Sequence, residues 1–529
     1  MIAAVSATIL ARFGPPPADA PVHLYRTLLF REGAVVWDNL WYSGHYPLSY
    51  GILFPVLTSI VGQLTLVIVG AVTSAAVFAA LCLRQFGDAA RWPARVFGVL
   101  AAAPLFTGLD SYSLGLTCLL GALLALQRGR PSIGGALGAI TLAFSPLAFA
   151  FLCLVLLAVV GARRFTVPNR AFVLRTGALI LAVGALGLLV LAAFPNGGVY
   201  PFKGWDLALV EALCVAAAGL AWSSPAGRPI AAVLVVWGAA CLVCFLVASP
   251  VGDNVTRLRG LALPVVMIAA LLVRFRPRWL TIVALVLAAA NNLGPLLTLI
   301  PDQLDQRPAH ASFWTATIGY LETHRAPGYR VEVVPTAAHW EAYWLPRAGI
   351  PLARGWFRQL DPASLYDGRL DRSTYVAWLH RTGTRFVLLP HTRLDQAGGP
   401  VEARNVVDAA PALRPVFDDG NVTVFALREP ATILTGASGD RITEFSHTRI
   451  SGVVTTAGAH HLSVRYMPYW RVERGEICLR RDAQGLTTIE SQRPGAFRLV
   501  VDQSPVKLAA QIAGDESDAG CQAISARAG

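Results

Sequence analysis

The sequence has few charged residues, and this shortage argues against an ordinary soluble protein. Only 14% of its 529 residues are Asp, Glu, Lys or Arg, whereas 55% are hydrophobic and the mean hydropathy is +0.53. A soluble globular domain has about a quarter of its residues charged. The composition therefore predicts a polytopic membrane protein, in which apolar segments of about 20 residues cross the bilayer.

Several motifs of soluble enzymes are also missing. The sequence contains no Walker loop, no dinucleotide-binding glycine pattern and no serine-nucleophile elbow, so a nucleotide-driven pump or a hydrolase has no support. No cysteine pair has the setting of a zinc site,. The net charge of +12 comes from arginines clustered between apolar runs, since the only lysines are Lys203 and Lys507. That pattern is typical of cytoplasmic loops, and we expect no nucleic-acid partner.

The apolar runs predict about eleven membrane spans. The run at residues 1–13 is too short to cross a bilayer and lacks the charged start and cleavage site of a signal peptide, so we interpret it as the remainder of a first span. Ser145-Pro146 is expected to join two half-length helices. Ten later runs complete the predicted set, at residues 63–86, 92–107, 113–127, 132–144, 147–161, 171–194, 207–222, 229–248, 258–273 and 279–300.

Arginine placement predicts the orientation of these spans. Every second connection carries arginines, at positions 84, 91 and 95, then 128 and 130, then 163, 164 and 170, then 228, and finally 274, 276 and 278. The other connections carry Asp19, Asp110, Asp206 and Asp253. Because arginine-rich loops stay in the cytoplasm, we predict that the first loop and the C-terminal region both lie outside a bacterial plasma membrane.

From Pro301 onward the sequence resembles that of a soluble domain. Alternating segments predict an exterior α/β domain at residues 301–430 and a β-sandwich-like module at 431–515, followed by a disordered tail at 516–529. If this region is exterior, Cys478 and Cys521 are able to form a disulfide. An aromatic and charged patch is interpreted either as an acceptor-binding edge or as a core helix, and comprises His339, Trp340, Glu341, Tyr343 and Trp344.

The first polar loop, residues 14–62, carries the clearest candidates for chemistry. Asp19 and His23 are four residues apart, so they share a face if the segment is helical. A carboxylate and an imidazole beside a bilayer are able to deprotonate an acceptor hydroxyl or to hold a divalent cation. The alternative is a solvated loop next to a membrane helix. A short helix along the membrane is expected at residues 24–32, followed by an aromatic approach to the next span.

Several short segments carry a resemblance to a known family. They are Asp19-x-x-x-His23-x-x-Arg26, residues 41–48 (WYSGHYPL), 128–131 (RGRP), 145–149 (SPLAF), 252–258 (GDNVTRL), 466–471 (YMPYWR) and Pro494-Gly495. Together they resemble the GT-C class of membrane glycosyltransferases, in particular bacterial proteins of the YfhO type. That group includes the "6-pyruvoyl-tetrahydropterin synthase-related" membrane proteins. The resemblance implies a helical GT-C-like membrane domain at residues 1–300.

The resemblance also implies roles for residues. Asp19 matches the catalytic base of the first loop, and His23 would orient it, share its proton or ligate a cation. Arg257, with Arg259 and Asn254, is predicted to bind the donor phosphate, because an arginine at the edge of a span is costly unless an anion compensates it. The alternative for these arginines is snorkelling toward the interface. Six further residues are candidates for lining the substrate pocket: Arg26, Trp41, Tyr42, His45, Tyr46 and Asp110.

The expected function is transfer of a sugar from a polyprenyl-phosphate donor to a cell-envelope glycan, lipid or protein on the non-cytoplasmic side. The competing hypothesis is a non-catalytic membrane carrier or scaffold for lipid-linked glycan assembly. A transporter would carry ionisable residues in the middle of its spans, and these spans have almost none. No cofactor is assigned, although a divalent cation bound by Asp19 and His23 is one hypothesis.

Overall fold

The computed structural model describes residues 1–161 and 170–512, and the chain divides into two compact units. The helical unit comprises Met1–Ala20, Tyr50–Leu189 and Gly197–Gln303. The mixed unit comprises Pro21–Ser49, Val190–Asn196 and the chain from Leu304 onward. Much of the first polar loop therefore belongs with the C-terminal half of the chain.

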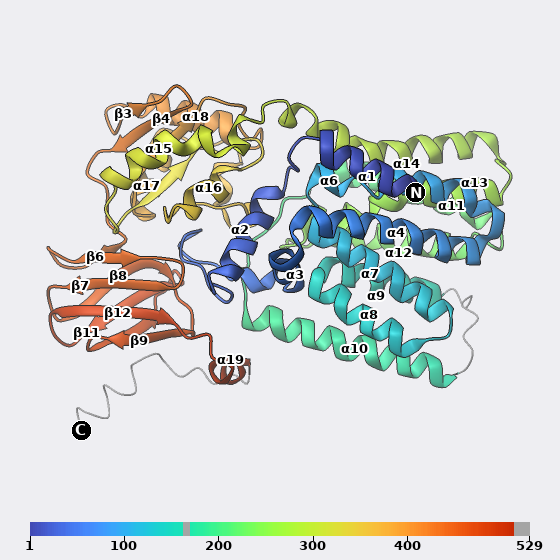
Figure 1. Ribbon diagram of the computed structural model, residues 1–529, viewed down its shortest axis with the longest axis horizontal. Helices are drawn as coiled ribbons and strands as arrows, with labels where there is room; N and C mark the ends of the chain where they lie inside the picture. Colours follow the sequence, from blue (N-terminus) through green and yellow to red (C-terminus); the bar gives the residue numbers. More distant parts are fainter. Residues whose placement is uncertain (162–169, 513–529) are drawn as a thin grey trace. The chain divides into compact units, whose positions relative to one another are not determined.

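The helical unit is built from helices whose long members run side by side (Figure 1). A short 3₁₀ segment, η2 (Gly87–Ala90), and a longer one, η3 (Gly252–Leu261), connect some of them, and a third, η4 (Pro301–Gln303), follows the last helix. The helices are α1 (Ile2–Phe13), α3 (Leu53–Val61), α4 (Gln63–Phe86), α5 (Arg91–Leu100), α6 (Pro104–Thr107), α7 (Asp110–Gln127), α8 (Pro131–Phe144), α9 (Pro146–Gly161), α10 (Arg170–Ala193), α11 (Gly204–Trp222), α12 (Arg228–Leu246), α13 (Ala262–Leu272) and α14 (Arg278–Leu299).

Five helical segments among the described residues are long and apolar enough to cross a membrane: Gln63–Thr107, Gly204–Trp222, Arg228–Leu246, Gly252–Leu272 and Arg278–Gln303. Four apolar helices are shorter, at Ile2–Phe13, Pro131–Phe144, Pro146–Gly161 and Gly177–Ala193. This is a helical membrane protein with a C-terminal β region, whereas the count of about eleven spans stays a prediction.

The break between α8 and α9 has a local cause. Pro146 has no backbone N–H and suits the first turn of a helix, so α8 ends one residue before Ser145 and α9 begins directly after it,. The Ser145 hydroxyl accepts a hydrogen bond from the Ala148 backbone N–H, at 3.2 Å. That bond satisfies one of the free donors of the first turn of α9.

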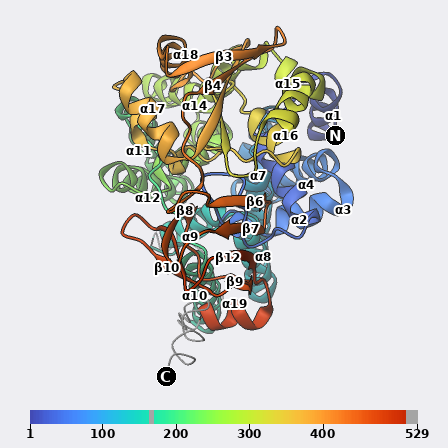
Figure 2. The ribbon, with the colours of Figure 1, turned by 90° about the vertical axis from the view of Figure 1, so that its left-hand side faces the viewer.

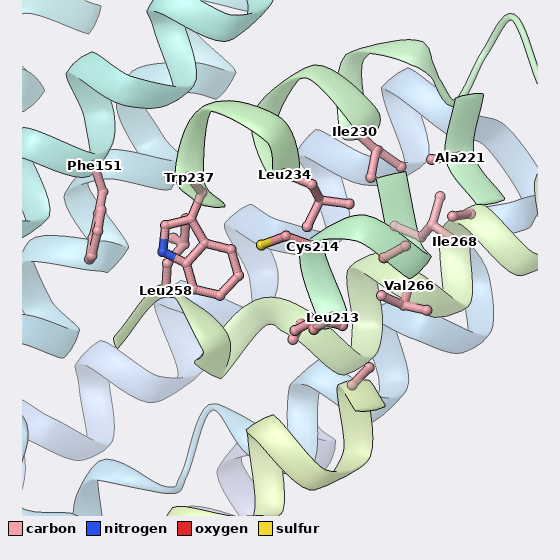
Figure 3. Packing of buried hydrophobic residues seen from close by; sticks show 14 of the residues in the cluster. Phe151, Leu213, Cys214, Ala221, Ile230, Leu234, Trp237, Leu258, Val266 and Ile268 are labelled. Carbon is pink, nitrogen blue, oxygen red and sulfur yellow. The ribbon is translucent and has the colours of Figure 1, made fainter. Parts of the chain in front are cut away.

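The core of the helical unit fixes the segment η3. Trp237 of α12 is buried in the same hydrophobic cluster as Leu258, Cys214 and Phe151 (Figure 3). A buried indole needs a partner for its N–H, and Trp237 Nε1 donates to the Val255 carbonyl oxygen at 2.9 Å. The hydrophobic core therefore holds the start of η3, which bears Arg257.

The first half of the mixed unit is a four-stranded sheet in the order β1-β2-β4-β3, in which only the β1–β2 pair is parallel. A hairpin joins β3 to β4 around Gly420, whose φ of +80° suits a glycine,. The strands are β1 (Arg330–Val333), β2 (Thr384–Pro390), β3 (Leu413–Asp418) and β4 (Val422–Leu427). The helices that accompany this sheet are α2 (Ala20–Arg31), whose first residue still belongs to the helical unit, α15 (Ala311–His324), α16 (Glu341–Arg347), α17 (Arg372–Arg381) and α18 (Gly399–Asp408). The 3₁₀ turns are η1 (Pro47–Ser49), η5 (Arg307–Ala309), η6 (Arg358–Leu360) and η7 (Ala363–Leu365).

The second half of the mixed unit contains two antiparallel sheets. One has the order β10-β11-β8-β5 and the other has the order β6-β7-β12-β9. The order of the second sheet can be followed in Figure 2. Leu462 and Ile489 of the first sheet share one buried cluster with Ile450 and Leu499 of the second, as in a β-sandwich. The elements are β5 (Leu434–Thr435), β6 (Arg441–Phe445), β7 (Arg449–Val454), β8 (Gly458–Arg465), β9 (Trp470–Arg474), β10 (Ile477–Arg481), β11 (Leu486–Ser491), β12 (Gly495–Val501) and α19 (Pro505–Ile512).

Cys478 of β10 is disulfide-bonded. Cys521 and the tail predicted at residues 516–529 lie outside the described residues. The pairing predicted for these two cysteines therefore stays a prediction.

Candidate functional site

Asp19 is held by backbone contacts with the end of α6. The Ala18 N–H donates to the Phe106 carbonyl oxygen at 3.2 Å, and the Asp19 N–H donates to the Thr107 carbonyl oxygen at 3.1 Å. Gly108, which ends α6, has a φ of +76°. A Cβ on Gly108 would lie 2.5 Å from the Asp19 nitrogen. This glycine is therefore required both by its conformation and by the close approach of the Asp19 backbone.

We expect Gly108→Ala to displace Asp19 and to lower any activity that depends on it by about 10- to 100-fold, since a shift of about 1 Å in a catalytic group has effects of that size. Gly129→Ala is the matched control. Gly129 also has a positive φ, of +70°, but no described atom lies within 4 Å of the position that a Cβ would take there, so it shares the left-handed strain without the clash. Transfer assays on both variants, at equal amounts of folded protein, test the idea. Equal losses in the two variants would contradict it.

Arg257 lies on η3, which several contacts position. Gly252 begins η3 with a φ of +46°, and a Cβ there would lie 2.2 Å from the Tyr200 carbonyl oxygen. At the other end, Asn292 of α14 donates to the carbonyl oxygens of Arg259 and Gly260, at 3.0 and 2.8 Å. Both ends of this short helix are thus anchored to other parts of the helical unit.

A cavity of about 330 Å³ in the helical unit brings the Asp19 loop and η3 together. Asp19 lines it with all three predicted phosphate-binding residues, Asn254, Arg257 and Arg259. Its lining contains further polar residues together with apolar ones. The polar residues include Ser74, Tyr112, Ser113, Thr117, Tyr200, Asp253 and Asn292, and the apolar ones include Phe97, Leu100, Leu116, Leu296 and Leu299.

The Arg257 guanidinium is surrounded by groups that favour its charge. Its Nη1 donates to the Tyr50 hydroxyl at 3.5 Å, and its Cζ lies 6.0 Å from the centre of the Tyr112 ring. It also interacts electrostatically with the Asp19 carboxylate. The cavity therefore combines a carboxylate, which is able to accept a proton, with a guanidinium, which is able to bind an anion.

Comparison with known proteins gives similarities in structure. No protein-family model matches the sequence, and no curated protein matches it. The chain is similar to the arabinofuranosyltransferase AftD from Mycobacteria, in a mutant form (TM-score 0.46, 18% identity, 88% of this chain) and in the unmutated form (0.46, 16%, 88%). It spans 43% and 41% of the length of those chains. It is also similar to ArnT from Cupriavidus metallidurans (TM-score 0.38, 14% identity, 78% of this chain and 93% of that one).

The likeness to proteins of the YfhO type stays a prediction. At 14–18% identity the reaction has to be argued from the residues of this chain.

Asp19 and His23 do not share a helix face, because α2 begins after Asp19, at Ala20. Asp19 belongs to the helical unit, whereas His23 and Arg26 belong to the mixed unit, where each is only 2% exposed. Arg26 Nη2 donates to the Pro47 carbonyl oxygen at 3.4 Å. Neither His23 nor Arg26 lines the cavity.

The aromatic candidates do not line the cavity either and form part of the core of the mixed unit. Trp41 stacks between Tyr25 and His45, with ring centres 4.3 and 5.2 Å apart. Tyr42 and Tyr46 are buried as well. The prediction that Trp41, Tyr42, His45 and Tyr46 line the substrate pocket therefore needs correction, since packing within the mixed unit covers these rings.

The mixed unit contains a buried network that was not predicted from the sequence. Asp38 accepts a hydrogen bond from the Tyr25 hydroxyl at 2.8 Å and pairs with His447 Nδ1 at 2.7 Å. Burial would raise the pKa of Asp38, but the hydrogen bond and charge of His447 lower it overall. Burial lowers the pKa of His45 to about 4, so this ring stays neutral at pH 7. No local pattern in the sequence links Asp38 to His447, which is 409 residues away.

Asp110, predicted to line the substrate pocket, is buried elsewhere in the helical unit. Its side chain accepts a hydrogen bond from Gln63 Nε2 at 2.6 Å, and it does not line the cavity. The residues 1–161 and 170–512 contain no group of three His, Cys, Asp or Glu side chains placed to hold a metal ion, so we assign no ligand set for a cation. Tyr200 and Asn292 were not predicted, although an Asn pair inside the last apolar run was an available signal,.

Proposed function

We propose that the helical unit transfers a sugar from a polyprenyl-phosphate donor to a hydroxyl group of a cell-envelope acceptor on the non-cytoplasmic side of a bacterial plasma membrane. The observation that carries this proposal is that Asp19 and Arg257, 238 positions apart, line one cavity whose lining includes both polar and apolar residues. A lipid-linked sugar phosphate likewise has a polar part and an apolar part. Its headgroup suits the polar lining residues, and the first part of its prenyl chain suits the apolar ones.

In the proposed reaction, Asp19 accepts the proton of the acceptor hydroxyl. The hydroxyl oxygen then attacks the anomeric carbon of the sugar from the side opposite the phosphate. The bond between that carbon and the phosphate oxygen breaks, and the polyprenyl phosphate leaves with the electron pair. Arg257 binds this anion as its charge develops, with Asn254 and Arg259 beside it. The anomeric configuration is inverted.

Membranes that contain the overproduced protein, supplied with radiolabelled polyprenyl-phosphate sugars, test the donor class. We expect label to pass from the lipid-soluble donor into an envelope fraction, and the same sugars supplied as nucleotide sugars to give no transfer in washed membranes. Transfer from nucleotide sugars alone would contradict the proposed donor. No transfer from any lipid-linked sugar would favour the carrier or scaffold.

A further inference from the structure

The mixed unit contains a second, much smaller cavity, beside α16. Its volume is about 20 Å³, and its polar lining comes from β1, from α16 and the turn before it, and from the segment around η6 and η7. A space of this size holds about one water molecule or one hydroxyl group. The lining includes Glu332, His339, Glu341, Arg354, Asp361 and Tyr366.

The charges around this cavity are unbalanced. Arg354 Nε donates to Glu332 Oε1 at 2.7 Å, and Arg354 Nη2 donates to Glu402 Oε2 at 2.6 Å. His339 pairs with Glu341 at 3.3 Å and lies 3.8 Å from Asp395. Asp361 also lines the cavity. Five carboxyl groups thus face one guanidinium and one imidazole, so the cavity is acidic.

Within the described part of the chain, two carboxylate oxygens at the cavity lack hydrogen-bond partners. Glu332 is fully buried, and its Oε2 accepts no hydrogen bond. Asp361 accepts a hydrogen bond from the Tyr366 hydroxyl through Oδ2, but its buried Oδ1 has no partner. Leaving a buried acceptor unsatisfied is unfavourable. A ligand group that donates hydrogen bonds would therefore be favoured in the cavity.

An aromatic surface lies on the same helix. Tyr343 and Trp344 of α16 are half-buried, with ring centres 4.9 Å apart. The exposed Arg347 donates to the Tyr343 hydroxyl at 3.0 Å and places its guanidinium 5.4 Å from the Trp344 ring centre. The indole nitrogen of Trp344 is buried, and no described residue accepts a hydrogen bond from it. We call Tyr343, Trp344 and Arg347 the α16 rim.

These features narrow the class of ligand. An anionic group would be repelled by the acidic cavity, and the described residues contain no set of three metal-ligating side chains. A neutral sugar donates hydrogen bonds through its hydroxyls and presents an apolar face to aromatic rings. We propose that the small cavity and the α16 rim bind a neutral glycan, one hydroxyl of which enters the cavity and donates its proton to one of the two unpaired oxygens, Glu332 Oε2 or Asp361 Oδ1,. That this glycan is the acceptor rests on the proposed function, whereas the binding site does not.

Isothermal titration calorimetry tests the site, with the full-length chain purified in a detergent that has no sugar headgroup. The probes are neutral hexasaccharides of glucose, mannose and arabinose, with a hexasaccharide of galacturonic acid as the anionic probe. We expect a neutral hexasaccharide to bind, and Trp344→Ala and Asp361→Asn each to weaken its affinity about 10-fold, which corresponds to about 1.4 kcal/mol. Trp205→Ala and Asp367→Asn, at exposed positions, should leave the affinity unchanged.

Three results would overturn the site: no heat from any neutral hexasaccharide, binding of the anionic probe alone, or unchanged affinity in both Trp344→Ala and Asp361→Asn. Melting curves of each variant separate lost binding from lost folding. Asp19→Asn should bind the hexasaccharide like the wild type. If Asp19→Asn both binds and transfers normally, the role of Asp19 as the base fails while the glycan site stands. If the wild type binds the hexasaccharide but transfers no label from any lipid-linked sugar, the proposed function fails while the glycan site stands.

Discussion

Asp19→Asn is expected to lower sugar transfer by about 10²- to 10⁴-fold, the range over which a positioned general base contributes to rate. The amide has almost the same shape as the carboxylate, and the contacts that hold this position are made by backbone atoms, Asp19 N to Thr107 O and Ala18 N to Phe106 O. The variant should therefore fold and still bind the donor. What it loses is the ability to accept the proton of the acceptor hydroxyl. The measurement is the initial rate of label transfer from polyprenyl-phosphate sugars.

Asp88→Asn provides the control for this substitution. Asp88 is also an aspartate in a connection between helices, but its side chain is 85% exposed and pairs with the exposed Arg91. Its transfer rate should equal that of the wild type. Equal rates for Asp19→Asn and the wild type would remove Asp19 from the mechanism, whatever the geometry of the cavity.

That Asp19 and Arg257 share one cavity was predictable from the sequence, because this prediction depends on the distribution of charge over all the connections and not on a local pattern. Arginine-rich connections alternate with the others, and the preference of arginine for the cytoplasmic side predicts that the Asp19 loop and the segment that begins η3 lie on the same side of the bilayer. Only a limited number of loops then remain to form a site there. The helix break at Ser145-Pro146 was also predictable, because a proline disrupts the helix in which it lies without help from residues remote in sequence.

The burial of the aromatic run in the core of the mixed unit was not predictable from the sequence. Trp41, Tyr42 and His45 are residue types that suit a sugar site, a membrane interface and a protein core equally well. Their place depends on partners remote in sequence, such as Phe357, whose ring centre lies 5.9 Å from that of Trp41. The network of Asp38 with His447 depends likewise on a contact that no local spacing encodes. Residue type identified candidates, and tertiary packing decided among them.

Replacement of Arg257 should also have a large effect, a fall of about 10²- to 10³-fold in kcat/KM, comparable with the removal of one group that stabilises developing negative charge. Arg257→Met keeps much of the apolar stem but leaves no charge for the phosphate. Arg257→Lys keeps the charge and loses the planar, two-pronged donor, so its rate should fall between those of Arg257→Met and the wild type. Arg128→Met, at an exposed arginine between α7 and α8, is the control and should transfer sugar normally.

Product inhibition separates phosphate binding from a merely structural or snorkelling role. If Arg257 binds the leaving group, free polyprenyl phosphate should inhibit Arg257→Met much less strongly than the wild type, while the melting temperature changes little. If the Arg257 side chain only snorkels toward the membrane interface, its replacement would leave both the transfer rate and the inhibition by polyprenyl phosphate unchanged. Because Arg259 lines the same cavity, Arg259→Met should show a smaller change in the same direction if the two guanidiniums share the anion. Unaltered inhibition in Arg257→Met would place the phosphate elsewhere and leave the cavity without its proposed anion site.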